Sequence, residues 1–225
     1  RRRHSFPTRR SSDLHARNLV TAFARLDGRP VGIVANQPLH LAGTLDGPAC
    51  EKGAHFVSVC DAYGLPLVYL IDLPGFLVGS AAERQGLARR SARLLFELGQ
   101  ASVTRMSVVL RKGYGLGAMG MSAGGFHAPS FTVAWPTGEF GAMGLEGAVR
   151  LGYRKELEAV PEGRERDALY AELVARQYEA GQGLNMAATL EIDAVIDPAD
   201  TRAWLARGLA SAQVAPLGHR FVDTW

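Results

Sequence analysis

A glycine-rich stretch, residues 111–125, carries the residue types best suited to chemistry in this chain. Six of the thirteen residues from Gly113 to Gly125 are glycine, and the stretch follows an apolar run, 106–110, that predicts a buried strand. A strand that opens through glycines into a helix leaves backbone N–H groups without partners. Such groups can stabilise negative charge developing on a carbonyl or ureido oxygen, or bind a phosphate. The stretch therefore predicts an anion-stabilising active-site loop.

Two general motifs overlap this stretch. Residues 120–124 fit the G-x-S-x-G pattern of a hydrolase with Ser122 as nucleophile, and residues 115–120 fit the G-x-G-x-x-G pattern of dinucleotide-binding sites. A nucleophile elbow places its serine in the strand-to-helix turn, whereas Ser122 lies about a dozen residues beyond the strand, in the expected helix. A serine hydrolase using Ser122 is thus one alternative. Nicotinamide binding is weaker, because an acid about 20 residues further on has no clear place.

Alternating strand and helix patterns must position this loop. Apolar runs predict strands at 23–26 and 31–36, joined by a turn at Asp27-Gly28, and further strands at 67–72, 108–110, 131–135 and 139–143. Helical patterns cover 46–63, 81–101, the segment from the glycine loop to about 124, 145–151, 164–180 and 201–210. Asp200 or Thr201 is the expected N-cap of the last helix. Helices between buried strands indicate a layered α/β domain.

Length and charge exclude some classes of protein. The 225 residues suffice for one sizeable domain, and no apolar run approaches the roughly 18 residues of a membrane span. The net charge of +3 comes from residues 1–17, which hold six arginines and one acid, so that 19 basic and 21 acidic residues remain. We therefore expect no nucleic-acid partner. Residues 1–17 are predicted to be a non-native or disordered flank, with the domain running over 18–225.

The two cysteines indicate a reducing compartment. Cys50 and Cys60 lie ten residues apart on one predicted helix, hence roughly 15 Å from each other, which excludes a disulfide between them. They have no metal-ligand spacing, so no metal is expected. A cytoplasmic location is the corresponding prediction.

Four blocks carry a resemblance to a known family. In order along the chain they are Asn36-Gln37-Pro38 at the end of 29–38, Asp72-Leu73-Pro74-Gly75-Phe76, Arg111-Lys112-Gly113-Tyr114-Gly115, and Trp135-Pro136-Thr137-Gly138-Glu139, which leads into 143–149. Over about 18–209 the chain is similar to the C-terminal half of the carboxyltransferase (β) subunit of biotin-dependent acyl-CoA carboxylases, of which propionyl-CoA carboxylase is a familiar member.

The resemblance implies a crotonase-like (ClpP/crotonase) α/β fold, a spiral of ββα units. It implies that 18–225 is the biotin-side domain of a partial subunit that lacks the N-terminal CoA-binding domain. The implied reaction transfers a carboxyl group from carboxybiotin to the α-carbon of an acyl-CoA. The implied partners are a biotin carboxylase and biotin carrier protein, the N-terminal carboxyltransferase domain of a neighbouring subunit, and further copies in a hexamer, with neither nucleic acid nor membrane.

The family's site residues transfer by motif. The backbone N–H groups of Leu116 and Gly117, next to Gly115, match the donors to the ureido oxygen. The turn Pro74-Gly75-Phe76 matches the other wall of the biotin site, where a backbone carbonyl near Phe76 meets a ureido N–H. Met119 and Ala118 match the acyl pocket. The cofactor is biotin, the substrate acyl-CoA, and no metal is implied for this subunit.

This chain departs from its relatives at two of these positions. Relatives have Gly-Ala at 116–117, and leucine at 116 disfavours a left-handed backbone there, so the donor pair depends on local geometry. Met119 replaces an aspartate found in several relatives, and a flexible apolar side chain favours a different or larger acyl group.

A crotonase-fold hydratase or isomerase is the nearest different enzyme, and it needs a carboxylate near the loop. Glu139 and Glu146 are instead expected to be a strand-end acid and a first-turn acid. Tyr114 is expected to pack with its hydroxyl bonded. His55 and His127 are expected on the surface, while His40 could border the site.

Overall fold

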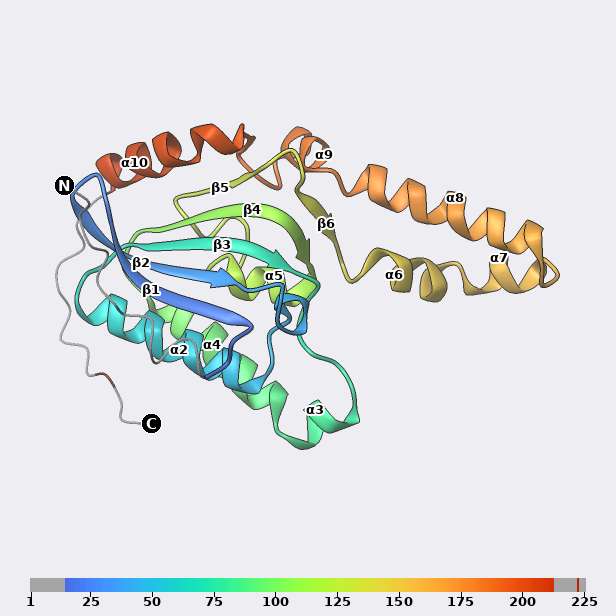
Figure 1. Ribbon diagram of the computed structural model, residues 1–225, viewed down its shortest axis with the longest axis horizontal. Coiled ribbons are helices and arrows are strands. Elements are labelled where there is room, and N and C mark those ends of the chain that lie inside the picture. Colours follow the sequence, from blue (N-terminus) through green and yellow to red (C-terminus); the bar gives the residue numbers. More distant parts are fainter. Residues whose placement is uncertain (1–14, 213–221, 223–225) are drawn as a thin grey trace.

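The computed structural model describes residues 15–212 and Val222, and within them a seven-stranded sheet lies between layers of helices (Figure 1). The strand order is β1-β2-β3-β4-β5-β7. β5 pairs with the first half of β4, and β6 pairs with its second half. The strands are β1 Leu19–Leu26, β2 Arg29–Asn36, β3 Leu67–Leu73, β4 Arg105–Tyr114, β5 Phe131–Ala134, β6 Glu139–Gly141 and β7 Ala194–Val195. The helices are α2 Gly47–Ala62, α3 Ser80–Arg84, α4 Leu87–Gln100, α5 Gly115–Met121, α6 Leu145–Gly152, α7 Arg154–Ala159, α8 Arg164–Ala180, α9 Gly183–Ala188 and α10 Thr201–Ser211, with short 3-10 turns η1 Leu41–Gly43 and η2 Pro198–Asp200.

One antiparallel hairpin opens a sheet that is otherwise parallel. β1 and β2 pair antiparallel around Asp27 and Gly28, both at positive φ, which confirms the predicted turn. The pairs β2–β3, β3–β4, β4–β5, β4–β6 and β5–β7 are parallel. Because parallel strands end at a common edge, the loops after β2, β3 and β4 are brought together.

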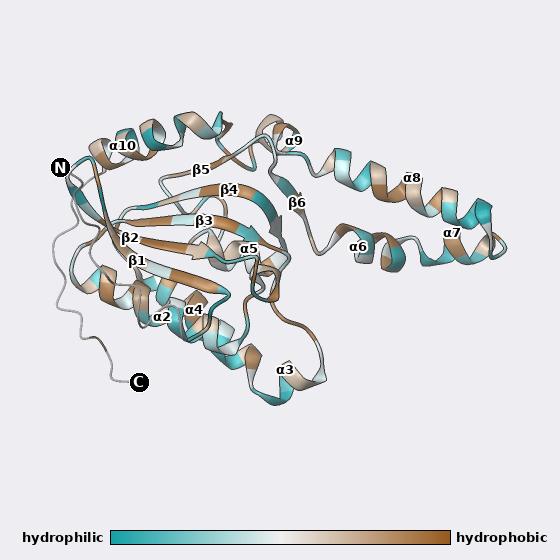
Figure 2. Ribbon diagram, in the orientation of Figure 1, coloured by the Kyte–Doolittle hydropathy of each residue, from teal (hydrophilic) through white to brown (hydrophobic). Residues whose placement is uncertain are grey.

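Helices cover both faces of the sheet, so the central strands are mainly apolar. One core lies between the sheet and α2 and α4, and a second lies between the opposite face and α10. Figure 2 shows β2 and β3 as mainly hydrophobic, while β4 turns hydrophilic toward its carboxyl end. Asp46 caps α2 by accepting a hydrogen bond from Ala49 N–H at 3.0 Å. Cys50 and Cys60 are free and fully buried on this helix, as predicted.

Several predicted bounds differ from the structure: β1 begins at Leu19 rather than at 23, and α5 ends at Met121 rather than near 124. The helix expected over 81–101 is divided into α3 and α4, because Gly86 adopts a left-handed backbone with φ of 75°. The strand expected at 108–110 extends to Tyr114, since β6 pairs with its second half, from Lys112↔Glu139 to Tyr114↔Gly141. The glycine stretch therefore begins inside a strand and turns only at residue 115.

The C-terminal third is helical, as predicted, and α8 spans the expected residues. We call α6, α7 and α8 the arm, because they extend away from the sheet (Figure 1). α7, α9 and β7 were not anticipated. Asp200 occupies the N-cap position of α10, but its side chain makes no capping hydrogen bond, and the Thr201 hydroxyl donates to Pro198 C=O at 2.8 Å. None of the helices within 15–212 is both long and apolar enough to cross a membrane.

Candidate active site

Two glycine turns meet at the carboxyl edge of the sheet. The donor turn (residues 114–117) follows β4, and the Pro-Gly-Phe turn (residues 74–76) follows β3. A Cβ placed on Gly117 would lie 2.7 Å from both Cα and C of Gly75, and Gly75 itself has φ of 134°. Such contacts are too close for any side chain, so the two backbones touch. The structure thus brings together the two segments that the sequence predicted as opposite walls of one site.

The donor turn leaves backbone N–H groups without helical partners. Gly115, Leu116 and Gly117 are the first three residues of α5, and Tyr114 is its N-cap without a side-chain capping bond. The N–H groups of a first helical turn have no carbonyl to bond within the helix. The left-handed conformation falls on Gly115, with φ of 57°, where a Cβ would meet Ala142 C=O at 2.6 Å. Leucine at 116 is therefore compatible with this backbone.

The Pro-Gly-Phe turn is tied to the chain before α2. Leu45 and Phe76 form a parallel bridge in which Leu45 N–H donates to Gly75 C=O at 3.1 Å and Leu77 N–H donates to Leu45 C=O at 2.8 Å. In such a bridge the peptide groups of Phe76 face away from Leu45. The Phe76 ring lies under α5, with Cζ 3.5 Å from a Cβ placed on Gly120.

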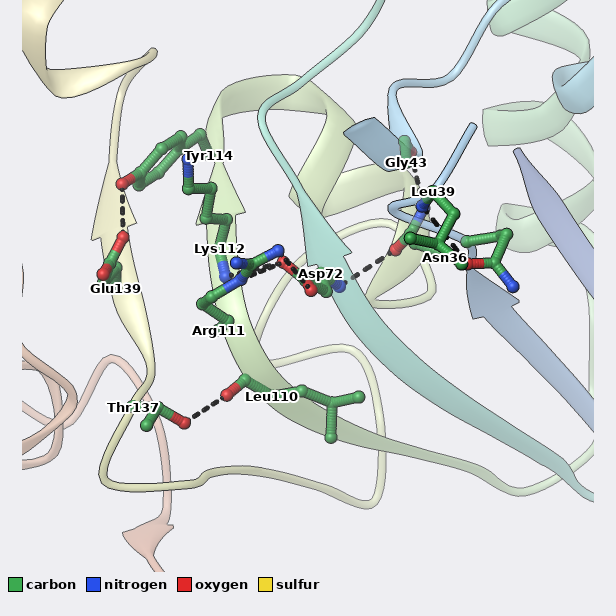
Figure 3. A network of polar contacts seen from close by, with 11 residues as sticks. Asn36, Leu39, Gly43, Asp72, Leu110, Arg111, Lys112, Tyr114, Thr137 and Glu139 are labelled. Carbon is green, nitrogen blue, oxygen red and sulfur yellow. Dashed lines mark hydrogen bonds and ion pairs between the residues drawn. The ribbon is translucent and has the colours of Figure 1, made fainter. Parts of the chain in front are cut away.

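A polar network fixes the loops on either side of these turns (Figure 3). Arg111 makes a bidentate pair with Asp72, at 3.1 and 3.0 Å, and Asp72 also accepts from Lys112 N–H at 3.3 Å. Asn36 accepts from Asp72 N–H at 3.1 Å and donates to Gly43 C=O at 3.0 Å. The hydrogen bond to Asp72 raises the pKa of Arg111 above its usual value.

This network joins the carboxyl ends of β2, β3 and β4. The sequence alone did not predict that these side chains would contact one another. Asn36 and Asp72 each stand at the end of an apolar strand, inside blocks that carried the family resemblance. Polar side chains at the carboxyl ends of neighbouring parallel strands are the signal that could have located them.

Two tyrosine–glutamate pairs lie behind the donor turn. Tyr114, only 2% exposed, donates from its hydroxyl to Glu139 Oε2 at 2.8 Å (Figure 3). Tyr178 donates to Glu146 Oε1 at 2.8 Å. Burial, and then the bond to Glu139, raise the pKa of Tyr114, while the bond to Glu146 raises the pKa of Tyr178 to about 12. The Glu146 backbone N–H and the Tyr178 hydroxyl lower the pKa of Glu146. The expectations for Tyr114, the strand-end Glu139 and the first-turn Glu146 are confirmed.

The remaining predicted residues are divided between core and surface. Ala118 is fully buried in the core, so its methyl group does not line an open surface of this chain, whereas Met119 is 39% exposed and Leu116 is 65% exposed. Ser122 is fully buried at the end of α5 and donates to Ala118 C=O at 2.8 Å. It does not occupy the strand-to-helix turn that a hydrolase nucleophile needs.

The histidines lie outside the two turns. His55 is exposed on α2, and His127 is exposed in a loop where it meets Glu191 at 3.8 Å, as expected for both. His40 is half-buried and precedes η1, the turn that Asn36 closes. In residues 15–212 no group of three or more His, Cys, Asp or Glu side chains is arranged to hold a metal ion.

Known proteins match the chain over nearly all of its length. Residues 11–220 match the carboxyl transferase domain family. The β5 subunit of a biotin-dependent acetyl-/propionyl-coenzyme A carboxylase from Mycobacterium tuberculosis is 42% identical over 91% of this chain and 38% of its own length. The methylmalonyl-CoA carboxyltransferase 12S subunit of Propionibacterium freudenreichii is 44% identical over 87% of this chain and 37% of its own length. The chain thus spans less than two fifths of these relatives.

Solved structures of such enzymes share the fold. Transcarboxylase 12S, with methylmalonyl-coenzyme A bound, superposes with a TM-score of 0.80 at 42% identity, covering 91% of this chain and 39% of the other. A single-chain, multi-domain long-chain acyl-CoA carboxylase superposes at 0.76 with 48% identity, covering 84% and 18%. The fold of this chain is therefore the crotonase-like α/β fold of these carboxyltransferases, and the chain belongs to the carboxyl transferase domain family.

Proposed function

We propose that residues 18–225 are the C-terminal, biotin-side domain of an acyl-CoA carboxylase carboxyltransferase subunit. In this proposal the domain helps to move a carboxyl group from carboxybiotin to the α-carbon of an acyl-CoA. The observation that carries it is the contact between Gly117 and Gly75, which sets the free N–H groups of α5 beside the Pro-Gly-Phe turn. The family match begins at residue 11 and Ala16 packs against the core, so the predicted flank of residues 1–17 overlaps the family match at its end.

The donor set suits the ureido ring of biotin. Leu116 and Gly117 would donate backbone N–H groups to the ureido oxygen, and so stabilise the negative charge left there when the carboxyl group departs. A backbone carbonyl near Phe76 would accept a ureido N–H. Carboxybiotin supplies the carboxyl group and, once that is lost, a ureido nitrogen basic enough to take the α-proton. Because all these groups are backbone, this half of the site needs no titratable side chain.

Apolar side chains beside the donor turn favour a large acyl group. Leu116 and Met119 are exposed on α5. The long-chain acyl-CoA carboxylase, at 48% identity, is among the relatives of this chain, along with acetyl-/propionyl-CoA enzymes. We infer an acyl group longer than acetyl. The decisive assay is carboxylation of acyl-CoAs of graded length by the assembled enzyme, in which a strict acetyl-CoA preference would contradict the inference.

The proposed partners are those of a shared active site. They are a biotin carboxylase with its biotin carrier protein, the N-terminal carboxyltransferase domain of a neighbouring subunit, and further copies of the subunit. Transcarboxylase 12S is described as a hexamer, which supports a hexamer for this subunit as well. The two buried free thiols support a cytoplasmic location.

The direct test is decarboxylation of malonyl-CoA or methylmalonyl-CoA that depends on free biotin. We expect activity when this chain is supplied with an N-terminal carboxyltransferase half, and none from either half alone. Hydration of an enoyl-CoA by this chain alone would replace the proposal with a hydratase, for which Glu139 is poorly placed because its carboxylate already accepts from Tyr114.

A further inference from the structure

Tyr114, which lies two residues before the first proposed donor, is held through both its backbone and its side chain. Tyr114 forms the last pair of β4 with β6, and its carbonyl oxygen lies 3.9 Å from a Cβ placed on Gly75. Its ring is buried, and its hydroxyl reaches Glu139 Oε2 at 2.8 Å. The chain then turns sharply at Gly115. The Tyr114 side chain is therefore held at the residue from which α5 starts.

The acceptor of this hydrogen bond is fixed by backbone pairing on two sides. Glu139 pairs with Lys112 of β4 on one side and forms an antiparallel bridge to Gln182 on the other. Phe140 N–H donates to Gly181 C=O at 2.8 Å, and Gly183 N–H donates to Gly138 C=O at 3.0 Å. A residue whose backbone is held this way offers a fixed starting point for a side chain that binds its neighbour.

The arm contacts the same cluster. Tyr178 of α8 bonds Glu146 of α6, and its phenol is close enough to Tyr114 to contribute to the raised pKa of that residue. Residues of the arm and of the donor turn thus form one polar cluster: Tyr114, Glu139, Glu146 and Tyr178.

We propose that Glu139, acting through the Tyr114 hydroxyl, is a positioning residue that sets the orientation of the Leu116 and Gly117 N–H groups. The inference rests on the proposed carboxyltransferase function. The hydrogen bond requires an acceptor at 139, not a charge or a transferable proton, because Tyr114 is the donor. This separates a positioning role from the acid–base role of a hydratase carboxylate.

Activity of the assembled carboxyltransferase tests this role. Tyr114→Phe and Glu139→Ala should lower kcat for biotin-dependent decarboxylation by about 10- to 100-fold, since small misplacements of catalytic groups cost about that much. KM for the acyl-CoA should stay within about twofold, and the pH profile should not move. Glu139→Gln keeps an acceptor for the Tyr114 hydroxyl and should retain most of kcat. Tyr63→Phe is the matched control, because it removes the phenol hydroxyl of a tyrosine that is 72% exposed at the end of α2 and should leave kcat unchanged.

Amide hydrogen exchange of this chain gives a readout that does not depend on activity. Exchange at residues 115–118 should accelerate in Tyr114→Phe and Glu139→Ala but stay at the wild-type rate in Glu139→Gln and Tyr63→Phe. Unchanged kcat and exchange in Tyr114→Phe would overturn the inference. So would a Glu139→Gln enzyme as impaired as Glu139→Ala with a shifted pH profile. An inactive wild-type assembly with the expected exchange pattern would instead refute the carboxyltransferase proposal and leave the positioning role standing.

Discussion

Gly117 is the residue at which the two walls of the proposed site touch. Gly117→Ala would place a Cβ 2.7 Å from Gly75 backbone atoms, which cannot yield as a flexible side chain does. We expect the free energy of unfolding to fall by about 1–3 kcal/mol, the usual cost of overpacking, and biotin-dependent activity to fall at least about tenfold. Gly147→Ala is the matched control, since its Cβ meets nothing within 4 Å. Denaturant titration and the decarboxylation assay measure both effects, and equal behaviour of the two variants would contradict the contact.

The reactivity of a second single residue, Ser122, distinguishes a serine hydrolase from the proposed carboxyltransferase. Its hydroxyl is buried and bonded to Ala118 C=O, so a fluorophosphonate probe should not label the native chain. Ser122→Ala should leave the proposed carboxyltransferase activity unchanged and lose about 1 kcal/mol of stability, the net value of one hydrogen bond. Labelling that disappears in Ser122→Ala would restore the hydrolase alternative.

At the scale of the element, the reactivity of the two cysteines on α2 measures how tightly this helix packs against the sheet. Cys60 lies against the sheet, with Sγ 2.5 Å from a Cβ placed on Gly32, and burial raises the pKa of both Cys50 and Cys60 from 9.0 to about 12. At pH 8 the thiolate fraction is therefore roughly a thousandfold below that of a free thiol. Iodoacetamide should label the native chain at least about a hundredfold more slowly than the denatured chain.

The same thiols give stability a defined pH dependence. A group whose folded pKa is raised stabilises the fold fully below its unfolded pKa and ceases to do so as pH rises through the folded value. For these cysteines the loss should fall between about pH 9 and 12. Cys50→Ser with Cys60→Ser is the control in which this loss at high pH should shrink; an unchanged pH dependence would assign it to other groups.

Local sequence patterns predicted most helices and strands, but not those ends that depend on contacts with distant residues. The hairpin at Asp27-Gly28 and helices α2 and α8 follow from turn residues, a cap and periodicity, all of which are local. The extension of β4 to Tyr114 depends on pairing with β6, 25 or more residues away in sequence, which no local signal records. The division at Gly86 was visible as a glycine, but only its left-handed φ decides that the helix ends there.

The sequence predicted which backbone turns form the candidate site, but not the side-chain contacts that hold these turns in place. The motifs singled out Gly75, Leu116 and Gly117, which lie on neighbouring turns in the structure, because these motifs mark where buried strands end. The Asn36–Asp72–Arg111 network and the Glu139 acceptor arise from side chains that meet across strands, which spacing along one strand does not specify. Ala118 faces the core because α5 turns it inward, a rotation that depends on where the helix begins.

At the scale of the whole molecule, exposed apolar side chains flank the site. Leu39 is 88% exposed after β2, Val78 is 89% exposed after the Pro-Gly-Phe turn, and Leu116 is 65% exposed on α5. Such exposure is typical of a surface that another part of an assembly covers. Hydroxyl-radical footprinting should show protection of Leu39, Leu116 and Met119 when an N-terminal carboxyltransferase half is added. Tyr63, 72% exposed at the end of α2, is the internal control, and equal protection there would indicate non-specific association.

The strand order also governs how long the chain takes to fold. Among the described strands only the pair β1 and β2 is joined by a tight turn, whereas Leu67 of β3 must meet Arg105 of β4, and Val133 of β5 must meet Ala194 of β7. A hairpin closes in about 1–10 μs, but parallel pairing waits for its intervening helices and places such folds in the millisecond-to-second range. During that interval the apolar edge of β3 stays open to other chains. Refolding yield should therefore fall steeply with protein concentration, and synthesis on the ribosome, where the hairpin emerges before the parallel strands that follow it, should give more native protein than dilution from denaturant.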